Sequence, residues 1–564
     1  MTDTSPRRVL GIEGTAWAAS AAVYDVTSDE VTIETEAYQP DSGGLHPREA
    51  AEHMADHVPE VVERALAHAR GRTDADPPVD CVAFSRGPGL GPCLRIAGTA
   101  ARAVAQRLDV PLVGVNHMVA HLEIGRHQSG FDSPVCLNAS GANAHVLGYR
   151  NGRYRVLGET MDTGVGNAID KFTRHLGWSH PGGPKVEKKA KEGEYIDMPY
   201  VVKGMDFSFS GIMSAAKDAA DSVSASDASG GSSEQSSDGG EAVEDICFSL
   251  QENIFAMLTE VTERALSLTG SDELVLGGGV GQNERLREML ATMCEQRGAK
   301  FYAPENRFLR DNAGMIAVLG AKMCAAGDTL DIEDSGIDAD FRPDQVAVSW
   351  RGKEPFTASA EERANESDGE RVQGAEATVS FEGSRVVKER LPRSYRHPAL
   401  DEQLRSQRTR KEARLTSEAR RAGVPTPVIR DVDTRETTIV FQHVGDCDLR
   451  EALTASNVRA VAESLAAIHE AGFVHGDPTT RNVRVNRNSS KDGPDVFLID
   501  FGLGYYTQHP EDHAMDLHVF EQSLDGTSDD ADELRAAAEE AYRAVGDSAV
   551  LDRLRDIEGR GRYQ

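Results

Sequence analysis

Apolar and polar residues in the first 340 positions follow two recurring patterns. Short apolar runs at 9–14 (VLGIEG) and 16–26 (AWAASAAVYDV) have the length and composition of buried strands. Residues 133–159 read as strand, glycine turn, strand, turn and strand. Longer stretches at 46–69 and 248–269 place apolar residues three and four positions apart, which predicts amphipathic helices. Because hairpins followed by long helices occur twice, we expect an α/β fold with two related lobes around a cleft.

Two polar segments interrupt this pattern. Residues 221–245 contain seven acidic residues, no basic residue and many Ser and Gly, a composition that cannot bury a core. We expect a disordered acidic insertion there. Residues 343–374 are also polar and predict an interdomain linker. The chain is therefore expected to divide into a first module, 1–342, and a second module, 375–564.

The charge balance is strongly acidic. Ninety-two acidic against 61 basic side chains give a formal net charge of −31 over 564 residues, while 39% of the residues are hydrophobic. We interpret this as an ordinary core under a halophile-like surface, which argues against general affinity for nucleic acid. Residues 385–421 break the trend with 12 Lys and Arg against 5 Asp and Glu. This run is either a solvated helix face or a surface that binds nucleic acid or a partner.

Cysteine spacing and the lengths of apolar runs indicate the cellular setting. The seven cysteines form no CxxC pair, so neither a disulfide framework nor a zinc ribbon is indicated. No apolar run reaches the roughly 18 residues of a membrane span, and the N-terminal sequence lacks the apolar region of a signal peptide. We expect a cytoplasmic protein that does not associate with membranes.

Three glycine-rich turns follow apolar strands, at 11–16, 138–146 and 276–283. Glycine lets the backbone approach a phosphate closely and direct its N–H groups toward it. Each turn alone is explained equally well by a tight bend. Three turns across two lobes resemble the nucleotide clasp of the actin-like ATPase and sugar-kinase superfamily.

His117 and His121 form a candidate metal-binding pair. Their spacing places both imidazoles on one face of a helix, near enough to share an ion. The zinc proteases with an HExxH motif need a Glu after the first His, and this chain has Met118. The pair alone is compatible either with a metal site or with two ordinary histidines on a helix.

Eight motifs occur in order over about residues 8–325, and together they closely resemble the universal tRNA threonylcarbamoyladenosine transferase family. They are GIEGTA, SRGPGLGPCLR, NHMVAHLEIG, GNAIDKFTRHLG, HPGGPKVE, DFSFSGI, GGGVGQNERLRE and FLRDNAGMIA. The resemblance implies a two-lobed actin-like fold. It also implies transfer of the threonylcarbamoyl group from L-threonylcarbamoyl-adenylate to the exocyclic amine of the adenosine 3′ of the anticodon, in tRNAs that read codons starting with A. AMP is released.

The same resemblance implies a metal site, with Fe²⁺ or Zn²⁺ held by His117, His121 and Asp311. Two neutral imidazoles and one carboxylate leave coordination positions open for substrate oxygens. The bound ion would act as a Lewis acid on the carbamoyl carbonyl.

Residues that bind the adenylate also carry over from the family. They are Asp170, Gly183, Glu187 and Asn283, together with a binding loop formed by Asn138, Ala139, Ser140, Gly141 and Ala142. This loop departs from the family pattern, because Asn138 replaces a Tyr and Ala142 replaces a Gly. An amide oxygen is a weaker ligand than a phenolate, and a methyl group crowds a close backbone approach. We therefore expect a ligand clasp altered in detail, without metal ligation by Asn138.

The second module carries the spaced motifs of a protein kinase. VVKERL places Lys388 on a predicted strand, and Glu412 on a basic helical stretch is positioned to pair with it. HGDPTTRN gives Asp477 and Asn482, and VFLIDFG gives Asp500. In such a site Lys388 contacts the ATP phosphates, Asn482 and Asp500 hold Mg²⁺, and Asp477 is the catalytic residue that orients the attacking hydroxyl or water.

The order and short length of these motifs resemble the small RIO-like kinase of the KEOPS complex, which in archaea is often fused to the transferase. No complete GxGxxGxV loop precedes Lys388, and no APE motif follows Asp500. A full peptide-binding lobe does not fit, so the resemblance implies an ATPase or atypical serine/threonine kinase that supports the transferase cycle. It further implies partners: tRNA, other KEOPS subunits and a separate synthase that supplies the adenylate.

Three other readings remain open from the sequence. The chain could be a metalloprotease, which Met118 disfavours, or a signalling serine/threonine kinase with a regulatory actin-like module. It could also be a KEOPS scaffold with one degenerate active site.

Overall fold

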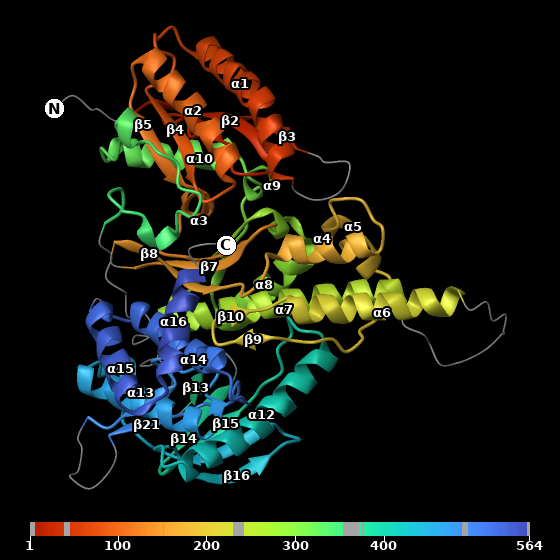
Figure 1. Ribbon diagram of the computed structural model, residues 1–564, viewed down its shortest axis with the longest axis vertical. Helices are drawn as coiled ribbons and strands as arrows, with labels where there is room; N and C mark the ends of the chain where they lie inside the picture. Colours follow the sequence, from red (N-terminus) through yellow and green to blue (C-terminus); the bar gives the residue numbers. More distant parts are fainter. Residues whose placement is uncertain are drawn as a thin grey trace.

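The computed structural model describes residues 6–38, 46–150, 152–228, 242–352, 371–374, 377–487, 495–528 and 530–560. Figure 1 shows the chain passing from one sheet with its helices at the top, through a second sheet, to a further body at the bottom. Helices and strands are mixed throughout, so the predicted α/β class is confirmed. Within the described ranges, no helix combines the length and apolarity needed to cross a membrane.

The first sheet has the strand order β3-β2-β1-β4-β5. β1 pairs antiparallel with β2 and parallel with β4, while β3 and β5 extend the sheet on either side. The inner strands are buried almost throughout, as their apolar runs predict, whereas edge strand β3 is partly exposed. The strands are β1 (Arg8–Glu13), β2 (Ala18–Asp25), β3 (Glu30–Ala37), β4 (Cys81–Gly87) and β5 (Leu112–Asn116).

The second sheet has the order β12-β11-β6-β7-β8, and its pairing repeats that of the first. β6 pairs antiparallel with β7 and parallel with β11, β7 pairs antiparallel with β8, and β11 pairs parallel with β12. In each sheet, three strands thus form an antiparallel meander. On its other side, the first strand of the meander pairs with a parallel strand, and a second parallel strand lies beyond that one. The strands are β6 (Val135–Ala139), β7 (Ala144–Arg150), β8 (Arg153–Glu159), β11 (Glu273–Gly277) and β12 (Lys300–Tyr302).

Helices cover both faces of the first sheet. Leu10 and Ile12 face a cluster with α1 (Pro47–Arg72) and α2 (Gly91–Leu108), whereas Val9 faces α3 (His117–Ser129) and α10 (Ala313–Ala325). This alternation follows from the two-residue period of a strand. Buried side chains of β6, β7 and β11 belong to the same cluster as α3 and α10. These two helices therefore pack between the two sheets.

The other face of the second sheet is covered by helices, of which α7 is the longest. The predicted helices at 46–69 and 248–269 are confirmed as α1 and α7. The elements of this region are α4 (Val165–His175), α5 (Gly183–Ala190), β9 (Val202–Lys203), β10 (Asp206–Phe207), α6 (Ser210–Ala228), α7 (Val243–Thr269), η1 (Gly279–Gln282), α8 (Glu284–Arg297) and α9 (Asn306–Leu309).

The C-terminal body begins with an antiparallel sheet in the order β13-β14-β15-β17-β16, and helices with a separate apolar core follow it. Figure 1 shows α12 beside this sheet and α13 to α16 on its other side. The elements are β13 (Arg371–Gln373), β14 (Thr378–Glu382), β15 (Arg385–Glu389), α12 (Pro398–Arg421), β16 (Ile429–Asp433), β17 (Thr438–Gln442), β18 (Cys447–Asp448), α13 (Ala455–Glu470), β19 (Phe473–Val474), β20 (Val483–Val485), β21 (Val496–Leu498), β22 (Tyr505–Tyr506), α14 (Pro510–Asp525), α15 (Ala531–Val545) and α16 (Ser548–Arg560).

The expected insertion at 221–245 is shorter in the structure. Helix α6 continues through Ala228 and α7 already begins at Val243, and residues 229–241 lie outside the described residues. The helix runs past its expected end, and Val223, within the expected insertion, packs partly buried against the core that covers the second sheet.

The expected linker at 343–374 is ordered at both ends. Arg351 lies 3.2 Å from Glu123 of α3, and Trp350 stacks against Tyr154 of β8, so residues 343–352 pack on the first module. Residues 371–373 form β13 of the C-terminal sheet. Residues 353–370 lie outside the described residues. The polar composition of this segment gave no indication that Trp350 and Arg351 hold residues 343–352 against the first module.

Candidate functional sites

His117, His121 and Asp311 come together between the two sheets. Both histidines lie on the first turns of α3, which starts directly after β5, and Asp311 directly precedes the cap of α10. Nε2 of His117 lies 3.3 Å from Asp311 Oδ1, and Nε2 of His121 lies 3.8 Å from the same oxygen. The possible ligand atoms of the three residues all fall within 4.8 Å of one another.

Glu13 supports this group from the first glycine-rich turn. Its Oε2 lies 3.1 Å from His117 Nδ1, and its Oε1 accepts a hydrogen bond of 2.8 Å from the Thr15 backbone N–H. Burial opposes protonation of His117, but Glu13 and Asp311 outweigh it and raise its pKa to about 10. Burial lowers the pKa of His121. The residues thus form a compact carboxylate–imidazole cluster.

The donor set fits a transition-metal ion. Within the described residues, neither ring nitrogen of the buried His121 makes a hydrogen bond. Two imidazoles and a carboxylate suit Fe²⁺ or Zn²⁺. A His that binds metal usually bonds a carboxylate through its other nitrogen, the position that Glu13 takes at His117. The GIEGTA motif contained Glu13, but its spacing gave no reason to single it out.

Residues 138–142, the expected binding loop, comprise the end of β6 and the start of the turn that leads to β7. Asn138 is fully buried, and its Nδ2 donates to Met118 Sδ at 3.4 Å, so it faces the metal-site helix α3. Ala142 is exposed at the turn, which gives its methyl group space. The backbone N–H groups of Gly166 and Asn167 donate to the Ser140 and Gly141 carbonyls at 3.2 and 2.9 Å. The loop is therefore tied to the start of α4.

Asp170, Gly183, Glu187 and Asn283 are connected through short contacts in the second lobe. Asp170 Oδ1 accepts 2.7 Å from the N–H of Gly182, next to Gly183, and Glu187 Oε1 accepts 2.9 Å from the N–H of Glu284, next to Asn283. Asn283 caps α8, since its Oδ1 accepts from two backbone N–H groups. Its acceptor capacity is thus used within the protein, and its Nδ2 group donates to Gln251 at 3.0 Å.

Two further contacts link these groups to His121 and to the first sheet. A Cβ on Gly277 would lie 3.2 Å from His121 Cβ and 3.4 Å from Asn138 Oδ1, so the third glycine-rich turn abuts both. The Trp17 ring of the first lobe stacks on His180 of the second, with centroids 4.8 Å apart and planes 6° apart. Sequence reasoning missed this contact between the lobes.

A second cluster lies in the C-terminal body. Lys388 of β15 lies 2.9 Å from Glu412 Oε1 of α12 and 2.6 Å from Asp500 Oδ1. The expected strand, helix and Lys–Glu pairing are all present. Asp500 has φ of 65°, a left-handed conformation that few side chains other than Asp and Asn adopt. The cluster thus presents a lysine and two carboxylates at one place.

Asp477 and Asn482 lie on the loop that follows β19. Asn482 Nδ2 donates to Asp477 Oδ2 at 2.9 Å, and the Asn482 carbonyl accepts from the Ile499 N–H at 3.0 Å, one residue before Asp500. Asp516 of α14, which sequence reasoning missed, accepts from the His475 N–H at 2.6 Å and fixes this loop. The structure therefore places Asp477, Asn482 and Asp500 on adjoining segments.

The basic run at 385–421 does not form a single exposed surface, which corrects one reading of the sequence. Five of its twelve basic residues are buried: Lys388, Arg390, Arg393, Arg396 and Arg408. They pair with carboxylates inside the protein, including Glu260 and Glu263 of α7. Part of the local charge excess is therefore compensated by acids more than a hundred residues away in the sequence.

A cavity of about 670 Å³ lies between the two modules. It is lined by β7, β8 and residues 340–343 on one side and by α14 and α16 on the other, and it contains none of the predicted site residues. Among its buried groups, burial raises the pKa of Asp206 to about 8, and Glu159 adds to the effect.

Known proteins resemble this chain along its whole length. A family model described as tRNA N6-adenosine threonylcarbamoyltransferase matches residues 27–318. A relative from Haloarcula marismortui, named probable bifunctional tRNA threonylcarbamoyladenosine biosynthesis protein, is 68% identical and covers 99% of this chain and 100% of the relative. A relative of the same name from Methanospirillum hungatei is 49% identical, covering 98% and 99%. A solved Rio2 kinase from Chaetomium thermophilum, in complex with ADP, Mg²⁺ and phosphoaspartate, is 14% identical with a TM-score of 0.24, covering 36% of this chain and 75% of that one.

Proposed function

This chain belongs to the tRNA N6-adenosine threonylcarbamoyltransferase family, and on that premise we propose that its first module transfers a threonylcarbamoyl group to tRNA. The donor is L-threonylcarbamoyl-adenylate, and the acceptor is the exocyclic amine of the adenosine 3′ of the anticodon in tRNAs reading codons that start with A. The observation that carries this proposal is the convergence of His117, His121 and Asp311 beside the glycine-rich turns.

The bond changes define what the residues must do. The amine nitrogen forms a bond to the carbamoyl carbon, the bond from that carbon to the phosphate oxygen breaks, and AMP leaves while the amine loses a proton. His117, His121 and Asp311 would hold one Fe²⁺ or Zn²⁺ ion, which when bound supplies Lewis-acid polarisation of the carbonyl. Glu13 orients His117 through its Nδ1 atom, so that Nε2 faces Asp311.

The loop at 138–142 and the group of Asp170, Gly183, Glu187 and Asn283 would bind the adenylate. Hydrogen bonds from Gly166 and Asn167 hold the loop against α4, which carries Asp170. Because Asn283 uses its oxygen as a helix cap, we assign it the role of fixing the turn at 276–283. Trp17 on His180 limits the opening between the lobes.

The second module would act as an ATPase or atypical serine/threonine kinase that supports this cycle. Lys388, held by Glu412, would contact the ATP phosphates, and Asn482 and Asp500 would bind Mg²⁺. Asp477 would orient the attacking hydroxyl or water. The adjoining positions of these residues support the proposal. The expected modules, 1–342 and 375–564, are then extended by residues 343–352, which pack on the first module, and by residues 371–373 of the C-terminal sheet. The expected partners are other KEOPS subunits and a separate adenylate-forming enzyme in the cytoplasm.

One assay tests the transfer directly. The purified chain is supplied with threonine, bicarbonate, ATP, the adenylate-forming enzyme, the other complex subunits and unmodified tRNA, and modified nucleoside is measured by mass spectrometry. We expect product with the wild type and a loss of at least about 100-fold with His117→Ala/His121→Ala, as for the removal of a metal that stabilises charge by several kcal/mol. Full product from the double variant, or none from the wild type, would refute the proposal.

A further inference from the structure

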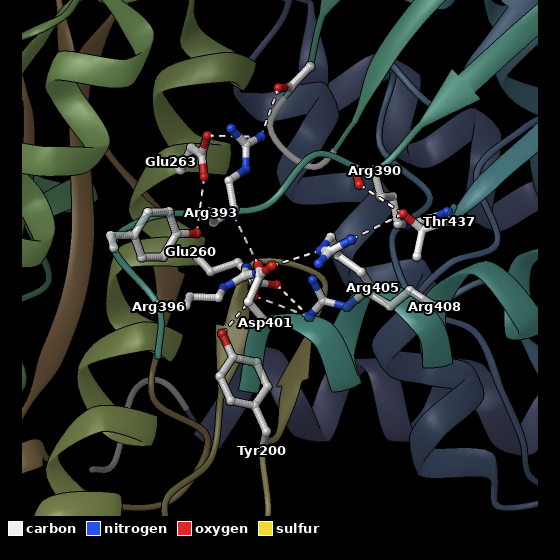
Figure 2. Close-up of polar contacts among 12 residues, drawn as sticks. Tyr200, Glu260, Glu263, Arg390, Arg393, Arg396, Asp401, Arg405, Arg408 and Thr437 are labelled. Carbon is white, nitrogen blue, oxygen red and sulfur yellow. Dashed lines mark hydrogen bonds and ion pairs between the residues drawn. The ribbon is translucent and has the colours of Figure 1, made fainter. Parts of the chain in front are cut away.

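The interface between the two modules is built from buried ion pairs. Figure 2 shows Arg393 directed at Glu263 of α7, and Arg396 and Arg408 directed at Glu260 of the same helix. Glu260 contacts Arg264 of its own helix, Arg396 at 2.5 Å and Arg408 at 2.9 Å. Removing either partner from such a buried pair leaves an uncompensated charge. These contacts therefore fix α7 and α12 relative to each other.

A second set of contacts leads from this interface to the ATP site. Arg405 donates to Asp401 Oδ2 at 2.7 Å and to Thr437 Oγ1 at 3.3 Å, and Thr437 Oγ1 donates to the Arg390 carbonyl at 2.9 Å (Figure 2). The Arg390 side chain contacts Glu412 at 2.5 Å and lies 3.8 Å from Asp500. Arg390 therefore shares both carboxylates with Lys388.

A third set leads from the interface to the adenylate site. Near the start of α7, Gln251 accepts from Asn283, and Glu252 forms two hydrogen bonds with Arg285 at 2.5 and 2.9 Å. Arg285 also donates to the backbone carbonyl of Tyr395 at 3.3 Å, within the segment that joins β15 to α12. Helix α7 and Arg285 thus contact the proposed adenylate turn and the second module at once.

We propose that the arginine-rich segment 390–408 couples the two nucleotide sites, so that a nucleotide bound at either site changes the affinity of the other. This inference rests on the proposed assignment of both sites. ATP phosphates and Mg²⁺ compete with Glu412 and Arg390 for Lys388 and Asp500. The resulting shift of Arg390 is passed through Thr437, Arg405 and Asp401 to Arg396, which lies 3.6 Å from Asp401 and pairs with Glu260. A close-packed interior transmits such small displacements.

Arg405 is the residue at which this coupling is best interrupted. Its side chain contacts both Thr437 and Asp401 and is 19% exposed. Arg405 also lies outside both nucleotide sites. Arg414 is a matched control on the same helix, because it forms an exposed pair with Glu418 at the same four-residue spacing.

The experiment measures linkage by calorimetry on the full chain. AMP probes the first module, and Mg²⁺ with a non-hydrolysable ATP analogue probes the second. The Asp500→Asn variant assigns the sites, since it should lose analogue binding and retain AMP binding. In the wild type, saturating analogue should change the AMP dissociation constant by about 5-fold or more, and AMP should change that of the analogue by the same factor. Arg405→Gln should reduce the factor toward one, Arg405→Lys should restore part of it, and Arg414→Gln should leave it unchanged.

The outcomes separate the inference from the proposed function. AMP binding that is indifferent to the analogue, or a factor unchanged in Arg405→Gln, would overturn the coupling while leaving the site assignments intact. Absence of AMP binding to the wild type would overturn both. If Arg405→Gln does not fold, Thr437→Ala replaces it, with Thr438→Ala as the neighbouring control, whose hydroxyl contacts only the Glu436 carbonyl among the hydrogen bonds described.

Discussion

Oε2 of Glu13 lies 3.1 Å from Nδ1 of His117, although the two residues are 104 positions apart in the chain. The Glu13 carboxylate is fully buried at the end of β1, and His117 is the first residue of α3. This contact fixes the direction of the His117 ring, so that Nε2 faces Asp311. A glycine-rich turn that the sequence suggested for phosphate binding therefore orients a candidate metal ligand.

The first prediction concerns metal affinity. Glu13→Gln keeps the size of the side chain but removes the charge that supports His117 as a ligand. We expect metal affinity to fall by about 10- to 100-fold, the usual effect of losing such an outer carboxylate. Competition with a chromophoric chelator measures the change. Glu34→Gln on edge strand β3 of the same sheet serves as the control and should bind metal as the wild type does. Equal affinities in both variants would contradict the role given to Glu13.

The second prediction separates the two modules. Asp500→Asn removes a charge from the expected Mg²⁺ site, so ATP turnover should fall by at least about 100-fold, as for other losses of metal-ion catalysis. Because Asp500 lies in the C-terminal body, metal binding at His117 and His121 should be unaffected. Phosphate release and metal content, measured on the same preparation, test both statements. Undiminished turnover would remove Asp500 from the ATP site.

The third prediction concerns the stability of the interface. Glu260 is buried and contacts Arg264, Arg396 and Arg408. Glu260→Gln leaves these guanidinium groups without their shared carboxylate, which should destabilise the protein by about 3–5 kcal/mol. Thermal denaturation measures the loss, with the exposed Glu295→Gln on α8 as the control. A melting temperature equal to that of the control would show that water or other acids compensate these arginines.

Local patterns of apolar residues were sufficient to predict several elements of the fold. The strands at 9–14, 16–26 and 133–159 followed from short apolar runs and turns, and the helices at 46–69 and 248–269 followed from apolar residues three and four positions apart. His117 and His121 were recognisable for the same reason, since four residues make one helical turn. The position of Asp311 came from the family resemblance alone, because its approach to α3 depends on how α10 packs between the sheets.

The charge pattern was informative about composition and misleading about position. Residues 385–421 suggested an exposed basic surface, yet Arg393 and Arg396 are among the buried residues. Their compensating acids, Glu260 and Glu263, lie on α7 and looked like the polar face of an amphipathic helix. A one-dimensional charge count cannot detect pairing between segments that meet only after folding. The contacts of Glu13, Trp17 and Asp516 were not predicted for the same reason, because each of these residues meets its partner only in the folded chain.

The last prediction concerns pH. Burial, with a contribution from Glu159, raises the pKa of Asp206 to about 8, against 3.8 for the ordinary carboxyl. Between about pH 4 and 8 the folded protein therefore holds a proton that the unfolded chain has lost, so stability falls as pH rises through that window. Asp206→Asn keeps the group neutral and its oxygen able to accept the Glu159 N–H. At pH 8 the variant should gain at least about 1 kcal/mol, roughly 2–4 °C in Tm for a domain of 150–250 residues, and less at pH 5.

Asp512, which lines the same cavity, provides the opposite control. Burial alone would raise its pKa, but hydrogen bonds from Lys203, Thr507 and Tyr505 lower it below the ordinary value. Its ionised form is therefore favoured in the folded state, and Asp512→Asn should lose stability at pH 8, where Asp206→Asn gains it. Thermal melts of the two variants at pH 5 and pH 8 test the pair. Shifts of the same sign in both variants at pH 8 would mean that loss of negative charge near the cavity, rather than burial of Asp206, controls the pH dependence.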